Sequence, residues 1–243
     1  GSQSVAIGFA ALEAQNFTAA LDTYNVAVGS AAGAALISGI NNTLIGGLAG
    51  DALTGGGFDS NNARVAGADF NVAIGLEALT LDTKGNRSTA IGFGALRTQN
   101  FSNPTDSNNV AVGYRAGFAV TTGTANALIG SVAGDSLTTG TRNVAVGTSA
   151  LQNDQIGSKS VALGTRALTT QRAVSVTDMF NVAVGEDAGL EITTGANNVI
   201  IGGLAADAMN TGHSNVAVGK EALGATIDSS NSTAVGMLAL GSA

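Results

Sequence analysis

Short runs in which large and small side chains alternate recur along the whole chain. One run reads Asn-Val-Ala-Val-Gly at 25–29, and close copies start at Ser4, Asn143 and Asn181. Alternation with a period of two indicates a β-strand, because successive side chains of a strand point to opposite faces. Each copy therefore predicts a short strand, and the length of a coil leaves room for two short strands and two turns. We expect its Val and Ile residues to fill an interior and the Ala between them to face outward.

A glycine ends every run, and its spacing defines the repeat. Thirteen such glycines occur, separated by 17 residues in most places, by 21 in three and by 29 in one. A unit of this length is too short for a strand-helix-strand crossover, which needs about 30 residues. We therefore predict an all-β fold, a parallel β-roll or β-solenoid of about thirteen coils of 17–21 residues. The glycines are Gly8, Gly29, Gly46, Gly75, Gly92, Gly113, Gly130, Gly147, Gly164, Gly185, Gly202, Gly219 and Gly236.

The repeats form a single array over residues 4–240. Four coils make a 72-residue block between Gly92 and Gly164 and again between Gly164 and Gly236. The predicted blocks are 4–87, 88–159 and 160–231, with a partial coil at 232–240 and a loop insertion at 55–70 in the first block. Since the array starts at Ser4 and stops inside a repeat, we expect it to be a piece of a longer one.

Each coil supplies one large aliphatic side chain by one of two routes. Some coils have Leu four residues after the glycine and a polar residue at the seventh position, such as Leu79 and Asp82. Others have Gly or Ala at the fourth position and the large aliphatic at the seventh, such as Gly134 and Leu137. This compensation predicts a shared, closely packed interior, because a layer must be filled once and not twice.

The Asn or Ser that opens every run admits two interpretations. Neighbouring Asn side chains stack into amide ladders at the strand spacing, or each one only shapes its own turn. The sequence does not separate the two.

The small residue in the middle of each run forms a column without a polar member, with Leu or Ile in the third coil of each block. A long apolar stripe on a protein surface marks an interface. We predict that several copies pack these stripes around a common axis. The alternative is a wider single-chain solenoid in which both faces are interior. The candidate interface residues are Ala27, Leu44, Ala73, Ala111, Leu128, Ala145, Ala183, Ile200 and Ala217.

Charge and composition limit the partners. The net charge is −7, and ten Lys and Arg residues are scattered along the chain. Nucleic-acid binding needs clustered basic residues, so we expect no nucleic-acid partner. No apolar stretch is long enough to span a bilayer, so we expect no membrane insertion by this segment. The single His213 has no catalytic or metal-binding partner in its turn, and no catalytic constellation can be assembled. We predict no enzyme activity, no metal and no cofactor.

The repeated motif, with SVAIG at Ser4 and NVAVG at Asn25, Asn143 and Asn181, resembles the head repeats of trimeric autotransporter adhesins. It is equally similar to the shaft repeats of phage tail-fibre proteins, and the resemblance covers nearly all of residues 4–240. It implies a left-handed parallel β-roll, three chains per rod, and an extracellular location on a cell surface or virion. The coils here are longer than those of the adhesin heads, so no receptor-binding residue is carried over.

Lengthened loops are the best candidates for recognition, since loops on a rigid scaffold carry binding more often than the scaffold does. The three 21-residue coils are expected to bulge at 17–24, 101–108 and 174–180, where aromatic residues either contact a ligand or cap the edge of the roll. The insertion at 55–70 is the clearest candidate. Its proposed ligand-contact residues are Phe58, Asp59, Asn61, Asn62, Arg64 and Asp69.

These observations predict a structural or adhesive fibre segment, a homotrimer that mediates or presents attachment to a cell surface. The main alternative is a binding module whose 55–70 loop recognises a cell-surface glycan or protein. An ice-binding solenoid would need Thr at one position of every coil, and a glycan-cleaving solenoid would need a carboxylate pair in a groove. Thr does not stand at one position of every coil, and the acidic residues are few and scattered, so both interpretations are less favoured.

Overall fold

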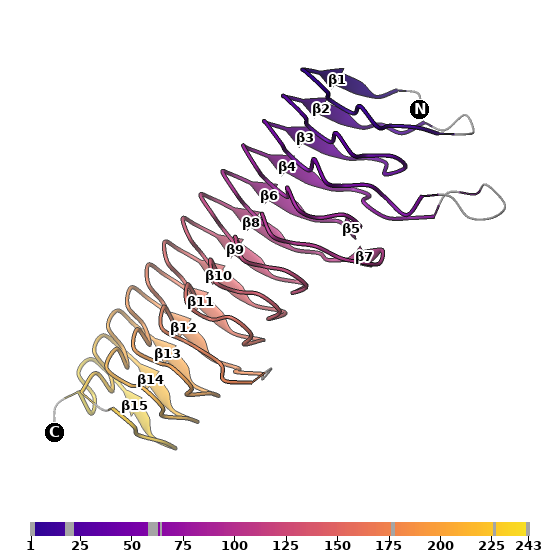
Figure 1. Ribbon diagram of the computed structural model, residues 1–243. Helices are drawn as coiled ribbons and strands as arrows, with labels where there is room; N and C mark the ends of the chain where they lie inside the picture. Colours follow the sequence, from indigo (N-terminus) through magenta and orange to yellow (C-terminus); the bar gives the residue numbers. More distant parts are fainter. Residues whose placement is uncertain are drawn as a thin grey trace. The chain divides into compact units, whose positions relative to one another are not determined.

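The computed structural model of the chain describes residues 3–17, 22–57, 63, 65–175, 178–225 and 227–241 (Figure 1). These ranges contain strands and turns and no helix. The chain divides into two compact units, residues 1–124 and 125–243. Each unit is a parallel β-solenoid, in which one short strand per coil pairs with the equivalent strand of the next coil.

In the first unit, six three-residue strands form one parallel ladder (Figure 1). The register is set residue by residue: Ala27 pairs with Ala6 on one side and with Leu44 on the other. A second, two-stranded sheet joins Gly85–Asn86 (β5) to Thr105–Asp106 (β7). The ladder strands are β1 (Val5–Ile7), β2 (Val26–Val28), β3 (Thr43–Ile45), β4 (Val72–Ile74), β6 (Thr89–Ile91) and β8 (Val110–Val112).

In the second unit, seven strands pair in the same parallel register, so that Ala145 pairs with Leu128 and Ala162. The prediction of an all-β parallel solenoid of thirteen coils is thus confirmed, while its handedness and the number of chains stay predictions. The strands are β9 (Ala127–Ile129), β10 (Val144–Val146), β11 (Val161–Leu163), β12 (Val182–Val184), β13 (Val199–Ile201), β14 (Val216–Val218) and β15 (Thr233–Val235).

The glycine after each strand stacks directly on the glycine of the next coil. Gly147 has a φ of +138°, and a Cβ placed on it would lie 2.4 Å from the carbonyl oxygen of Gly164. A side chain is therefore excluded twice, by the left-handed backbone conformation and by the neighbouring main chain. This explains why the repeat is anchored on glycine.

The middle column of the strands lies inside each coil, so the prediction that it faces outward and forms an oligomer interface is wrong. The opposite wall is built from Ala at the third position after each glycine and from the large aliphatic at the fourth or seventh. These side chains fill the layer and leave room only for a small residue on the strand. The nine proposed interface residues, all fully buried within one chain, are Ala27, Leu44, Ala73, Ala111, Leu128, Ala145, Ala183, Ile200 and Ala217.

The larger residues of that column fit because glycine stands opposite them. A Cβ on Gly134 would lie 2.8 Å from Leu128 Cδ2, and one on Gly50 would lie 2.9 Å from Leu44 Cδ2. The aliphatic residues that alternate between the fourth and seventh positions, such as Leu79 and Leu137, are fully buried. The prediction that each layer is filled once is thereby confirmed.

The Val and Ile residues on either side of the buried column point outward. Ile45 is 37% exposed, Val146 36% and Ile201 40%. In each unit the last residue of every ladder strand is aliphatic, and the first is Val, Thr or Ala. The sheet of each unit therefore presents an uncharged, mainly aliphatic face that one chain leaves partly exposed.

The Asn column performs both of the functions considered for it. Asn25 donates from its side chain to the carbonyl oxygen of Gly39 at 2.8 Å, which holds the turn of its own coil. Its side-chain oxygen accepts from the main-chain nitrogen of Asn42 at 2.9 Å and from the Asn42 side chain at 3.2 Å. Each buried amide thus shapes a turn and links two coils, which satisfies polar groups that burial would otherwise leave unpaired.

Candidate functional site

Most of the proposed ligand contacts in the insertion at 55–70 cannot be placed. Five of the proposed ligand contacts, Phe58, Asp59, Asn61, Asn62 and Arg64, lie outside the described residues. The sixth, Asp69, is 3% exposed, and its carboxylate accepts from the main-chain nitrogens of Ile40 and Gly67 at 3.0 and 3.2 Å. Asp69 therefore has little surface for a ligand, and it fixes the base of the insertion instead.

The bulge at 101–108 is fully described, and the structure shows how it is held. Thr105 and Asp106 pair with Gly85 and Asn86 of the preceding coil as β7 and β5. Asp106 also forms an ion pair with Arg87. The bulge is therefore fastened to the coil before it, while its other side faces the turn of the coil after it.

A buried polar cluster lies beneath this bulge. Gln99 donates to Asp82 at 2.6 Å and to Ser88 at 2.7 Å, and its side-chain oxygen accepts from Asn109 at 2.8 Å. All four of these residues are fully buried. Asp82 Oδ1 also accepts from the main-chain nitrogen of Gly85 at 2.9 Å. Burial raises the pKa of the Asp82 carboxyl, and the hydrogen bonds from Gln99 and from main-chain amides oppose that rise.

The second unit repeats this cluster beneath the bulge at 174–180. Gln171 donates to Asp154 at 2.5 Å and to Ser160 at 3.0 Å, and it accepts from Asn181 at 2.9 Å. The repeat pattern shows that the seventh position is polar where the fourth is Leu, but it does not show that these polar side chains are buried. The sequence does contain a pattern that marks these clusters. In both units, a coil with Asp at the seventh position is followed by a 21-residue coil with Gln at the seventh position.

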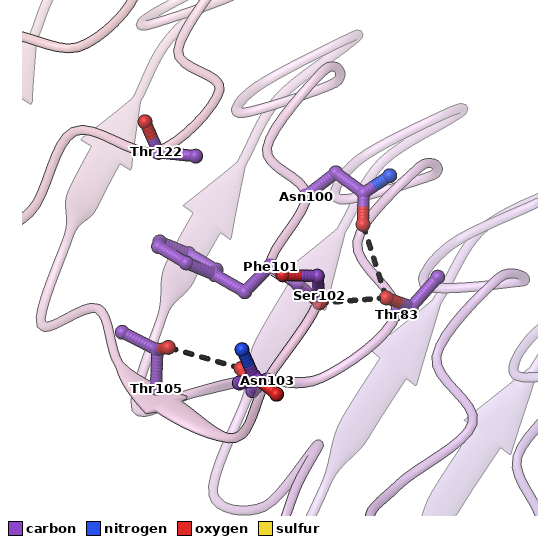
Figure 2. A pocket seen from close by; sticks show the side chains of 7 residues that line it. All are labelled: Thr83, Asn100, Phe101, Ser102, Asn103, Thr105 and Thr122. Carbon is purple, nitrogen blue, oxygen red and sulfur yellow. Dashed lines mark hydrogen bonds between the residues drawn. The ribbon is translucent and has the colours of Figure 1, made fainter.

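An open groove of about 440 Å³ lies along the bulge of the first unit. Its lining residues come from three successive coils, and Figure 2 places the bulge between Thr83 of the preceding turn and Thr122 of the following turn. The Phe101 side chain, 5% exposed, lies between these walls. All seven lining residues are uncharged: Thr83, Asn100, Phe101, Ser102, Asn103, Thr105 and Thr122.

Internal hydrogen bonds orient one wall of the groove. The Thr83 hydroxyl lies 2.8 Å from the main-chain oxygen of Phe101 and 3.0 Å from Asn100 Oδ1, and it donates to this pair of acceptors (Figure 2). Thr105 donates to the main-chain oxygen of Asn103 at 2.9 Å. The Asn100 side chain is thus turned so that its NH₂ group is left to donate elsewhere.

Other polar groups of the groove have no protein partner within the described part of the chain. The side chains of Ser102, Asn103 and Thr122 form no hydrogen bond with the protein there. The groove therefore offers hydroxyl and amide groups, each able to donate and to accept, beside the edge of an aromatic ring. Sequence reasoning proposed the bulge but missed Thr83 and Thr122, because they belong to the turns of neighbouring coils.

A second groove, also about 440 Å³, lies beside the bulge of the second unit. The two linings share two positions of the repeat: Gln155 stands where the first groove has Thr83, and Arg172 where it has Asn100. In the sequence, Ala173 stands where the first bulge has Phe101. It is lined by Ser136, Asn153, Gln155, Thr170, Arg172 and Thr193.

Within the described residues, no three His, Cys, Asp or Glu side chains gather in a way that could hold a metal ion. No helix capable of crossing a membrane is present in those parts of the chain. His213 is exposed in its turn, where its main-chain nitrogen donates to Ser230 at 3.2 Å.

Comparison with models of known protein families, with curated proteins and with solved structures finds no match.

Proposed function

We propose that this chain is a structural and adhesive fibre segment that assembles as a homotrimer and mediates or presents attachment to a cell surface. The observation that carries the proposal is the outward face of the ladder strands. In each unit it is uncharged and mainly aliphatic over every coil, and side chains such as Ile45 and Ile201 keep 37% and 40% of their surface exposed.

A regular aliphatic face of this kind favours a partner with the same regularity. Exposed apolar surface of this extent marks an interaction site on a protein, and coils stacked at about 4.8 Å present it as a straight stripe. A further copy of the chain offers the same spacing and the same chemistry. The resemblance of the repeats to trimeric adhesin heads and tail-fibre shafts supports three copies and an extracellular location.

The interface proposed here differs from the one that the sequence analysis named. The middle column, with residues such as Ala145, is occupied by packing within one chain, whereas its neighbours Val144 and Val146 point outward. Self-association thus remains the proposal, with the Val and Ile columns in place of the Ala column.

Light scattering of the 23.7 kDa chain tests the assembly. We expect a molar mass of three chains, and we expect Val146→Glu and Ile201→Glu to shift it to one chain, because a buried unpaired charge would be strongly unfavourable at the interface. Val174→Glu is the matched control, since Val174 is 83% exposed on a bulge and away from the strands. A wild-type monomer at micromolar concentration would refute the trimer.

Attachment is tested separately from assembly. The chain, displayed on beads, is expected to bind host-type cells, and the Val146→Glu monomer is expected to bind more weakly because it loses multivalency. Beads that carry the trimer but bind no cell type would restrict the function to a structural spacer.

A further inference from the structure

We propose that the groove formed by Thr83, the bulge at 100–105 and Thr122 is a binding site for an uncharged saccharide. This inference deepens the adhesive function proposed above and rests on it, since it names the chemistry that the fibre segment would attach to. It assigns recognition to the bulge of the first unit and not to the outward face of the ladder strands.

The first argument is the composition of the groove. All seven lining residues are uncharged, in a chain with 17 acidic and ten basic residues. A phosphate or carboxylate ligand would find no Lys or Arg in this groove, and the net charge of −7 opposes its approach. An apolar ligand would cover hydroxyl and amide groups without giving them hydrogen bonds, which is costly.

The groove also carries hydrogen-bonding groups that have no partner among the described residues. Ser102 and Thr122 carry hydroxyls, while Asn103 carries an amide and Asn100 an NH₂ group that its bond from Thr83 leaves available. Hydroxyls and side-chain amides each combine donor and acceptor atoms. Neighbouring sugar hydroxyls have the same dual character, so several can be bonded at once by this set.

The third argument is shape and rigidity. A volume of about 440 Å³ lies in the range of small-ligand sites, roughly 300–1,000 Å³. The Phe101 side chain, only 5% exposed, packs between the two walls and helps to fix the shape of the groove. The bulge is held by the β5–β7 pairing and by the buried bonds of Asp82 and Gln99. A preorganised site of this kind loses little entropy on binding.

The experiment uses the full chain and an immobilised panel of neutral oligosaccharides ending in galactose, glucose, mannose or N-acetylglucosamine, with sialylated counterparts of each. We expect one or more neutral members to bind and the sialylated forms to bind more weakly. Affinity for the best probe, measured by calorimetry, is expected to fall at least about tenfold in Asn103→Ala combined with Thr122→Val, because two hydrogen bonds are lost.

The second groove supplies the matched control. Asn153→Ala combined with Ser136→Ala removes comparable groups from the groove beside Arg172 and should leave the affinity for the neutral probe unchanged. Thermal unfolding of both double variants should stay close to that of the wild type. Absence of any binding to the neutral panel, or equal loss in both double variants, would overturn the proposal.

Molar mass measured on the same samples separates the two proposals. A trimer that binds no saccharide would overturn the site and leave the fibre segment standing. A monomer that binds a neutral saccharide through Asn103 and Thr122 would support the site and refute the trimeric fibre.

Discussion

The two bulged regions, one in each unit, share their interior and differ at their edge. Beneath them, the bond from Gln99 to Asp82 measures 2.6 Å and that from Gln171 to Asp154 measures 2.5 Å. At the edge, Phe101 of the first region is replaced by Ala173 in the second. Buried polar groups tolerate little change because every donor needs its acceptor, whereas an apolar side chain at the edge has only to fit the space around it.

Their surroundings differ in charge as well. The first groove is uncharged, while Arg172 gives the second a guanidinium where the first has Asn100. One kind of buried cluster thus supports two surfaces of different chemistry. We expect any ligand preference of the two grooves to differ through exposed pairs such as Asn100 and Arg172.

Exchanging Phe101 or its counterpart Ala173 is expected to have the largest effect on the free energy of unfolding. Phe101→Ala should lower the free energy of unfolding of the first unit by about 3 kcal/mol, because a nearly buried ring is removed and a cavity is left. Ala173→Phe, at a position that is 7% exposed, should cost less, about 1–2 kcal/mol of strain. Urea unfolding of the single variants measures both. A loss below 1 kcal/mol in Phe101→Ala would mean that the ring is not part of the packing.

Removing the buried carboxylate should affect the two regions equally. Asp82→Ala and Asp154→Ala each leave a Gln side chain and a Gly main-chain nitrogen without their acceptor. The free energy of unfolding is expected to fall by about 2 kcal/mol in either variant, as it does when a buried polar group is left unsatisfied. Urea unfolding followed by a probe in each unit tests this. A difference of more than about 1 kcal/mol between the two variants would break the equivalence of the clusters.

The smallest expected effect is a dependence on pH. Burial raises the pKa of Asp82, and also that of Asp51 and Asp207, above the usual value for an aspartate. The folded chain then holds these protons more tightly than the unfolded chain does. The stabilisation is complete below the usual aspartate pKa and is lost as pH rises through the raised values.

Unfolding midpoints recorded in steps from about pH 3.5 to pH 7 measure this dependence. Asp82→Asn, which cannot ionise, should show a shallower decline than the wild type over that interval. A wild-type stability that rises throughout the same interval would contradict the assignment for all three carboxyls.

Much of the fold can be predicted from the sequence because the same pattern occurs in thirteen copies. The glycine spacing defines the coils, and the exchange between Leu at the fourth position and a large aliphatic at the seventh shows that they share an interior. The face of the strand was assigned wrongly. Alternation separates two faces but does not say which one is buried, and here the bulkier Val and Ile face outward because Ala and Leu from the opposite wall already fill the layer.

The candidate site was predictable only in part. The lengthened coils drew attention to the bulge at 101–108, since insertions in a regular array stand out. The contributions of Thr83 and Thr122 depend on how three coils stack, which no local pattern reveals. The sequence shows the polar residues Asp82 and Gln99, but it does not show that they are buried. Their burial is possible because Gln99 forms hydrogen bonds with Asp82, Ser88 and Asn109.

The Asn column has a consequence for how such a molecule can change. The side-chain oxygen of Asn42 accepts from the main-chain nitrogen of Asn71, the equivalent residue of the next coil, at 2.9 Å, although 29 residues separate Asn42 from Asn71. The bond from Asn42 to Asn25 is also 2.9 Å, across 17 residues. The contact between neighbouring coils is therefore the same whether the loop at the edge is short or long. Residues can be inserted in these loops, by evolution or by design, and the distance between coils is kept while the surface of the array changes.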